Sequence, residues 1–339
     1  MIQLPVPYKR FRNIQYPFSK HHLESITKIF LSQIIYYRHK IQRSIIQLAF
    51  KITSQIYNHY LVEGSFNRIQ NLEYFCKNLE PKFEEKMENF KQLIVDCVAL
   101  SKPLSILKFG DGDYYFLNGI PEGSAKPGNR ALSRALSSDE LVLIRERFKQ
   151  CNYYSCEILK ANRRKFAEVF PNKQIDFPAE FHYALLANKW LTKTFNGRIG
   201  LIGGNEKIGL IRELINFDSY KEYLGLDGFQ DYIDIPQRFA CDDLISTEKS
   251  IADQLINSKA DIFLIGIGHA KSAVLSQLHQ YRNAVFLDIG SGIDALAGVI
   301  DRDRPYFGEW ENYRIESFDY SKIDFLQYKK SQLKYVSPL

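Results

Sequence analysis

The sequence lacks the features that are typical of secreted, zinc-binding or membrane-spanning proteins. It holds 5 cysteines and 2 methionines among 339 residues, and the odd cysteine count shows no spacing typical of a disulfide framework or a structural zinc site. Its longest apolar runs, such as residues 262–267, fall far short of the roughly 18 residues that a membrane-spanning helix needs. The first residues also lack the regions of a secretory signal. We therefore expect a cytoplasmic protein.

Excess charge of one sign is confined to the start of the chain. Residues 1–60 contain nine lysines and arginines but only one acid, Glu24, whereas the whole chain has a net charge of +6. The rest of the chain is therefore slightly acidic, and no recognition motif accompanies the basic segment, so we expect no nucleic-acid partner. Hydrophobic and charged contents of 45% and 25% are typical of a globular protein.

The basic segment is predicted to be helical. Apolar residues recur at steps of three or four, which predicts one long helix or two across residues 21–60. The basic face suits an acidic partner or the inner face of a membrane, where we expect peripheral contact; alternatively it faces solvent on a helix packed against the main domain. A second helical stretch, about 68–100, ends before Pro103. We assign residues 1–100 to an N-terminal helical region.

From residue 104 onward, short apolar runs alternate with helical patterns. The runs predict strands at 104–109, 198–202, 261–265 and 284–287, and a further edge strand at 233–238. The helical patterns cover 138–149, 206–215, 247–258 and 271–281. This alternation predicts an α/β fold, a Rossmann-like and mostly parallel sheet with helices on both faces, over residues 101–315. Residues 316–339 form a C-terminal tail in this prediction.

The loop after the first predicted strand carries two carboxylates, Asp111 and Asp113. Gly110 and Gly112 let the backbone turn sharply, so both side chains could present oxygens to one hard cation, Mg²⁺ or Mn²⁺. Ligands of parallel sheets bind beyond the carboxyl ends of the strands, which is where this loop is expected. The alternative is an Asp-Gly turn whose side chains bond nearby amides. We name Asp111 and Asp113 as candidate metal ligands and catalytic residues.

Later strand ends carry further candidates for binding a phosphate or a sugar. Amides at the start of a helix attract phosphate, and Lys271 and Arg238 could add positive charge. Asp288 could hold a ribose or a sugar hydroxyl, Asp294 could lie near an acceptor, and either is a candidate base. At the end of the strand predicted at 198–202, the alternative is an ordinary turn capped by Asn205. The donor-binding candidates are Gly203, Gly204, Asn205, Arg238, Gly266, Gly268, His269, Lys271 and Asp288.

Three motifs in this order resemble those of the glycosyltransferases of the D-type fold (GT-D), which act in bacterial adhesin and surface-glycan glycosylation. They are Lys108-Phe109-Gly110-Asp111-Gly112-Asp113, Ile265-Gly266-Ile267-Gly268 and Leu287-Asp288-Ile289-Gly290. The resemblance covers about residues 100–300. It implies a Rossmann-like domain that binds a UDP-sugar with Mn²⁺ or Mg²⁺ at the pair Asp111 and Asp113, with Lys108, Phe109, Gly110 and Gly112 at the donor.

Two positions depart from the pattern of that family. Lys108 stands where the family favours arginine, which keeps the charge but loses the bidentate fork. Asp113 stands where it favours glutamate, so a cation would have to sit closer to the backbone.

The sequence thus predicts a metal-dependent glycosyltransferase with a nucleotide-sugar donor and a glycan, glycoprotein or lipid-linked acceptor. Two alternatives stay open: a non-catalytic nucleotide-sugar or glycan-binding scaffold, and another nucleotide-dependent phosphotransferase or hydrolase. Hydrolases of the D-x-D-x-T type are disfavoured, because Gly110 and Tyr115 occupy the places of the apolar residue and the threonine. A dehydrogenase or methyltransferase built on Gly266 is disfavoured because its glycine motif comes late in the sheet.

Overall fold

The computed structural model describes residues 82–119, 136–157, 160–236, 240–299, 313–315, 317–320 and 334–336. The chain divides between Ile56 and Tyr57 into two units, and all described residues belong to the second. The helix predicted at 21–60 and the candidate Arg238 lie outside the described residues. The membrane contact of that helix stays a prediction. No helix in the described ranges combines the length and apolar character that a membrane crossing requires.

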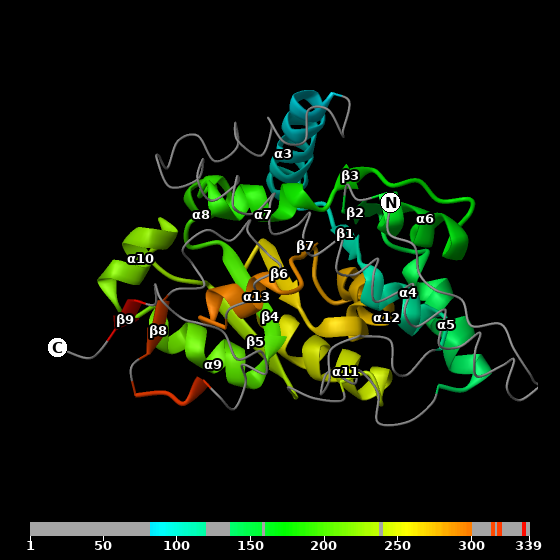
Figure 1. Cartoon of the computed structure of the whole chain (residues 1–339). Helices are drawn as coiled ribbons and strands as arrows, with labels where there is room; N and C mark the ends of the chain where they lie inside the picture. Colours follow the sequence, from blue (N-terminus) through cyan, green and yellow to red (C-terminus); the bar gives the residue numbers. More distant parts are fainter. Residues whose placement is uncertain are drawn as a thin grey trace, which may run out of the picture. The chain divides into compact units, whose positions relative to one another are not determined.

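Seven parallel strands form the central sheet, in the order β3-β2-β1-β7-β6-β4-β5 (Figure 1). The predicted α/β fold with a parallel sheet is confirmed. All six residues of β1 and of β4 are buried, as expected of strands covered on both faces. The strands are β1 (Leu104–Phe109), β2 (Tyr153–Cys156), β3 (Phe177–Pro178), β4 (Ile199–Gly204), β5 (Asp231–Ile235), β6 (Ile262–Gly266) and β7 (Val285–Asp288).

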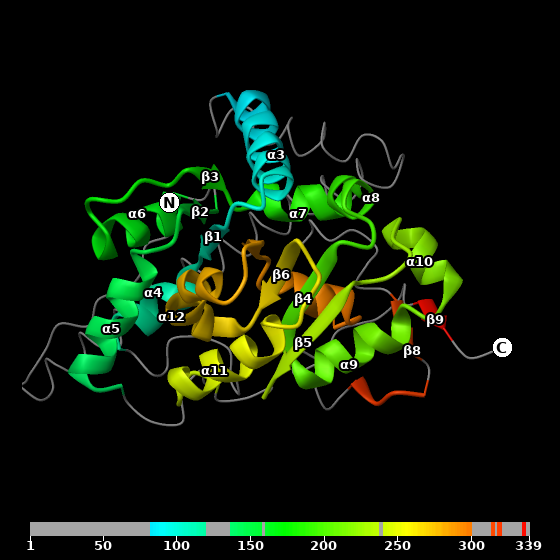
Figure 2. The same cartoon turned by 180° about the vertical axis from the view of Figure 1, so that it is seen from behind.

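Two layers of helices cover the two faces (Figures 1 and 2). Side chains of β1 point to both faces of the sheet, and each face has its own core cluster. Leu104 and Ile106 pack into one cluster, and Leu107 and Phe109 pack into the other. The first cluster lies under α3 (Phe83–Ala99), α7 (Glu180–Ala187), α8 (Trp190–Thr194), α9 (Asn205–Leu214), α10 (Asp218–Leu224) and α13 (Gly292–Leu296). The second lies under α4 (Asp111–Leu117), α5 (Ser138–Phe148), α6 (Lys160–Val169), α11 (Leu244–Leu255) and α12 (Lys271–Val274).

Elements on either side of the expected α/β segment also take part in its packing. Helix α3 lies within residues 1–100, yet its Phe90 ring packs against Phe177 and Phe181 beside the sheet. At the other end, β8 (Tyr313–Ile315) pairs in parallel with β9 (Lys334–Val336), which lies in the segment expected to be a tail. The packed unit therefore includes residues outside 101–315.

Three local predictions need correction. The acidic loop is the first turn of helix α4, not an open loop. The helix predicted at 271–281 is broken into the short α12 and a 3₁₀ segment, η2 (Leu275–Gln280), and a preceding 3₁₀ turn, η1, spans Gly268–Ala270. The edge strand predicted at 233–238 is β5, which lies at the sheet edge but begins and ends earlier.

Candidate functional site

The centre of the sheet contains a topological switch point, between β1 and β7. These strands are neighbours, but α4 after β1 packs on one face and α13 after β7 packs on the other. The two following loops therefore diverge at the carboxyl edge, which is where parallel α/β sheets bind ligands. Most of the residues named from the sequence lie on these two loops and on the turn after β6.

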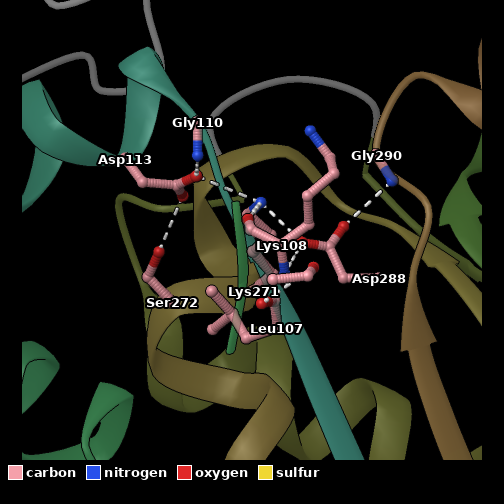
Figure 3. A network of polar contacts seen from close by, with 9 residues as sticks. Leu107, Lys108, Gly110, Asp113, Lys271, Ser272, Asp288 and Gly290 are labelled. Carbon is pink, nitrogen blue, oxygen red and sulfur yellow. Dashed lines mark hydrogen bonds and ion pairs between the residues drawn. The ribbon is translucent and has the colours of Figure 1, made fainter. Parts of the chain in front are cut away.

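One buried lysine, Lys271, joins these loops (Figure 3). Its ammonium Nζ lies 2.6 Å from Oδ2 of Asp288 and 3.1 Å from Oδ2 of Asp113, and it donates a hydrogen bond to the carbonyl of Lys108. The side chain of Asp288 is fully buried, and Asp113 and Lys271 are nearly so. Lys271 thus pairs with two carboxylates inside the protein, whereas we predicted that its charge would face a phosphate.

Both carboxylates also accept hydrogen bonds from other donors. Oδ2 of Asp113 accepts the Gly110 amide at 2.8 Å, and its Oδ1 accepts the Ser272 hydroxyl at 3.0 Å. The Asp288 carboxylate accepts the amides of Lys108 and Gly290 at 3.0 and 2.9 Å. Buried carboxylates are tolerated when they are paired and hydrogen-bonded in this way. The network therefore fixes the ends of β1 and β7 and the start of α4.

Asp113 and Lys271 both stay ionised in the folded protein. Burial alone would raise the pKa of Asp113, but Lys271, His269 and the Gly110 amide outweigh it and bring that pKa below its ordinary value. Burial alone would lower the pKa of Lys271, but Asp113 and Asp288 outweigh it and raise that pKa. Asp113 and Lys271 therefore form an ion pair at neutral pH.

Two glycines of the motifs named above, Gly112 and Gly290, lie where neighbouring side chains leave little or no space for a Cβ atom. A Cβ on Gly112 would collide with Nε2 of the His269 ring, which itself stacks on Phe116 with ring centroids 5.5 Å apart. Gly290 has a φ of +48°, and a Cβ there would lie 3.2 Å from Cε of Lys108. Both glycines thus let the network's loops approach one another.

Lys108 places a second ammonium at this edge. The residue is buried, and its Nζ lies 5.7 Å from the Tyr183 ring. A Cβ on Gly110 or on Gly290 would lie 3.9 or 3.6 Å from this Nζ, so the ammonium lies between the two diverging loops (Figure 3).

Other candidates lie apart from the network. Phe109 is fully buried and packs edge-on against Phe148 and Phe166, so it is a core residue. Gly203 and Gly204 end β4, and Gly203 lies beside Gly266 in the sheet register. Asn205 begins α9 instead of capping it, because Gly204 is the cap. Asp294, on α13, forms an ion pair with Lys207 on α9.

The structure also brings in residues that the sequence did not single out. Glu157 directly follows β2, and Glu180 begins α7 two residues after β3, so the carboxyl ends of these strands add two buried acids to the same edge. His182 on α7 is buried as well. The only available signal was the position of each acid after a strand, and these strands of 4 and 2 residues were too short to recognise.

The described residues contain no group of three or more His, Cys, Asp or Glu side chains that could hold a metal ion. Asp111 begins α4, and its side chain lies outside the described part of the structure. Both oxygens of Asp113 already accept bonds from protein donors. Of the two predicted ligands, Asp113 therefore orders the first turn of α4.

The buried His182 predicts a stability that depends on pH. Burial and the nearby Lys108 lower its pKa from 6.5 to about 3, whereas in the unfolded chain it takes up a proton near pH 6.5. Its stabilising contribution is therefore complete above pH 6.5 and is lost as the pH falls toward 3. We expect the unfolding free energy of wild type to fall by about 2 kcal/mol more than that of His182→Phe between pH 8 and pH 5. Urea unfolding at several pH values measures this, and parallel profiles for the two proteins would contradict it.

Comparisons with family models, with curated proteins and with solved structures each gave no match to this chain.

Proposed function

We propose that this chain is a glycosyltransferase that moves a sugar from a nucleotide-sugar donor, in the first place a UDP-sugar, to a glycan, glycoprotein or lipid-linked acceptor. One observation carries the proposal: the buried network of Lys271, Asp113 and Asp288 fixes the loops on both sides of the switch point. Well-packed apolar residues in place of a buried ion-pair network often give equal or greater stability. The value of the network is in holding Asp111 and Lys108 at the edge where ligands of this fold bind.

The charges at this edge suit a diphosphate. Lys108 places an ammonium between the Gly110 and Gly290 loops, where it can attract the phosphates of a donor. This role agrees with the resemblance of the Lys108 to Asp113 segment to the D-type glycosyltransferases.

A divalent cation, Mn²⁺ or Mg²⁺, is part of the proposal. Asp111 would hold it, and phosphate oxygens of the donor would provide further ligands, because Mg²⁺ commonly uses one or two carboxylates together with substrate phosphates. When bound, the cation would offset the charge that develops on the departing nucleoside diphosphate. Asp113 acts as a positioning residue for the turn that carries Asp111.

The two aspartates named as bases take other roles in this proposal. Asp288 is fully buried, with amide and ammonium donors on its oxygens, and it positions Lys271 and Gly290. Asp294 is held by Lys207. A base must lie within reach of the acceptor hydroxyl. The proposal therefore assigns no proton acceptor to either residue.

One observation favours the non-catalytic alternative, a nucleotide-sugar-binding module. The engagement of both Asp113 oxygens leaves one carboxylate of the predicted pair for a cation. A module of this kind would bind a donor without metal-dependent turnover.

A donor panel tests the proposal. UDP-, GDP- and CDP-sugars are incubated with the full chain, with Mn²⁺, with Mg²⁺ and with a chelator, and the released nucleoside diphosphate is measured. We expect slow, metal-dependent release from one donor class, because transferases often hydrolyse their donor when no acceptor is present. Donor binding without turnover would favour the module, and absence of both binding and turnover would overturn the proposal.

A further inference from the structure

Helix α6 carries its charges in the reverse of the order that stabilises a helix. Arg163, Arg164 and Lys165 lie in its first six residues, and its one acid, Glu168, lies in its last turn. Cations are unfavourable near the positive N-terminal end of a helix dipole, and acids are unfavourable near the other end. Stability of α6 does not account for this arrangement.

The neighbouring helix α5 shows the usual order. It has Asp139 and Glu140 in its first turn and Arg145 and Arg147 in its last turn, and Ser137 caps its start. The reversed order is therefore a property of α6 and not of the whole layer of helices.

The cations of α6 adjoin the candidate site through α4. The ammonium of Lys165 lies 5.4 Å from the Tyr114 ring and 4.9 Å from the Tyr115 ring, and these tyrosines follow Asp113 directly. Glu168 is hydrogen-bonded to the Tyr114 side chain, so the single acid is engaged by α4. The basic start of α6 and the two tyrosines thus form one surface, the α4–α6 face.

Arg163 connects this face with the edge of the sheet. Burial, together with Glu157 and Glu180, raises the pKa of the Cys156 thiol to about 12, and Arg163 and Lys108 act against this rise. Both cations therefore lie close to the end of β2, although they come from α6 and β1. Charges of both signs thus meet at the end of β2, whereas Arg164, the next residue of α6, is exposed.

The chemistry of the face fits a sugar that carries a phosphate. Arginine binds phosphate oxygens through paired N–H groups, and lysine adds a point charge. Tyrosine rings provide flat apolar surface with a hydroxyl at the edge, as sugar rings require. The face lies beside the proposed donor site, where an acceptor has to approach.

We propose that the α4–α6 face binds the phosphate group of a phosphate-bearing acceptor. This inference rests on the proposed transferase function and specifies its second substrate. The phosphate could belong to a soluble sugar phosphate or to a lipid-linked carrier, which share the group that the cations recognise.

A charge-reversal variant tests the proposal in the full chain. Arg164→Glu with Lys165→Glu is compared with Lys249→Glu with Lys259→Glu, an equal change in charge at two exposed lysines elsewhere on the protein. Calorimetry measures binding of glucose 1-phosphate, of geranyl diphosphate and of uncharged methyl glucoside. Arg164→Gln alone leaves Lys165 on the tyrosine rings and serves as the mild variant, and urea unfolding checks that each protein is folded.

We expect the α4–α6 variant to bind one or both phosphate probes about tenfold more weakly than wild type, and Arg164→Gln to show a smaller loss in the same direction. The control variant stays within about twofold of wild type. A loss confined to glucose 1-phosphate assigns the phosphate to a soluble sugar, and one confined to geranyl diphosphate assigns it to a lipid carrier.

Equal losses in the α4–α6 and control variants, or no loss in either, would overturn the inference. Release of nucleoside diphosphate from the donor panel is measured separately, with the wild-type protein. Phosphate binding that depends on Arg164 and Lys165, together with no donor turnover, would overturn the transferase function and still support a phosphate site on this face.

Discussion

Lys271→Met is expected to lower the free energy of unfolding by about 3–5 kcal/mol, the usual loss when one partner of a buried ion pair is removed. The substitution keeps the apolar stem of the side chain but leaves the Asp113 and Asp288 carboxylates buried without their shared ammonium. Equilibrium urea unfolding at neutral pH measures the change.

Lys149→Met provides the matched control. Lys149 is paired with Glu146 at 2.7 Å, but both side chains are about half exposed, so its loss should change stability by only about 0–1 kcal/mol. Equal effects of the two substitutions would show that the buried network does not hold the site together.

Asp111→Asn is expected to reduce metal-dependent donor hydrolysis by at least about 100-fold, with little change in stability. The proposal makes Asp111 the protein ligand of the cation, and about 3 kcal/mol of lost stabilisation in the transition state corresponds to this factor. The measurement is the rate of nucleoside diphosphate release over a titration with Mn²⁺.

Asp113→Asn distinguishes the role of Asp113 from that of Asp111. It removes one carboxylate from Lys271 and weakens the acceptors for Gly110 and Ser272, so we expect lower stability together with lower activity. If Asp113→Asn were as stable as wild type and Asp111→Asn were unstable, the roles assigned to them would be reversed.

Apolar runs predicted the centre of the sheet well. Strand β1 was predicted with its observed ends, and β4, β6 and β7 were predicted to within about two residues, because buried parallel strands are apolar on both faces. Strands β2 and β3 were missed. They are short, and Tyr153 and Cys156 in β2 do not form a run that differs from its surroundings.

The start of α4 could not be predicted from local preference. Asp111, Gly112 and Asp113 are poor helix formers, and together they suggest a turn. The helix begins there because Asp113 accepts the amide of its own N-cap residue, Gly110, and because Lys271 and Ser272 hold that carboxylate from a distant segment. A tertiary contact thus determines a local structure.

The role of Lys271 could not be predicted from the sequence, for a related reason. A lysine after a glycine turn has the same local pattern whether it faces a phosphate or two buried carboxylates. The whole of α12 is buried, with Lys271 and Ser272 turned toward Asp113, so packing determines its conformation and its partners. The motifs singled out these residues, but only the fold shows which of their charges are paired with one another.

The shared ammonium of Lys271 also makes the loops at the switch point cooperative. The same Nζ holds the end of β1, the first turn of α4 and the end of β7. Lifting any one of these segments means breaking the charge balance of the other two, so they open as one unit and not separately. A molecule that binds to one loop therefore slows the opening of all of them, including segments that it never contacts.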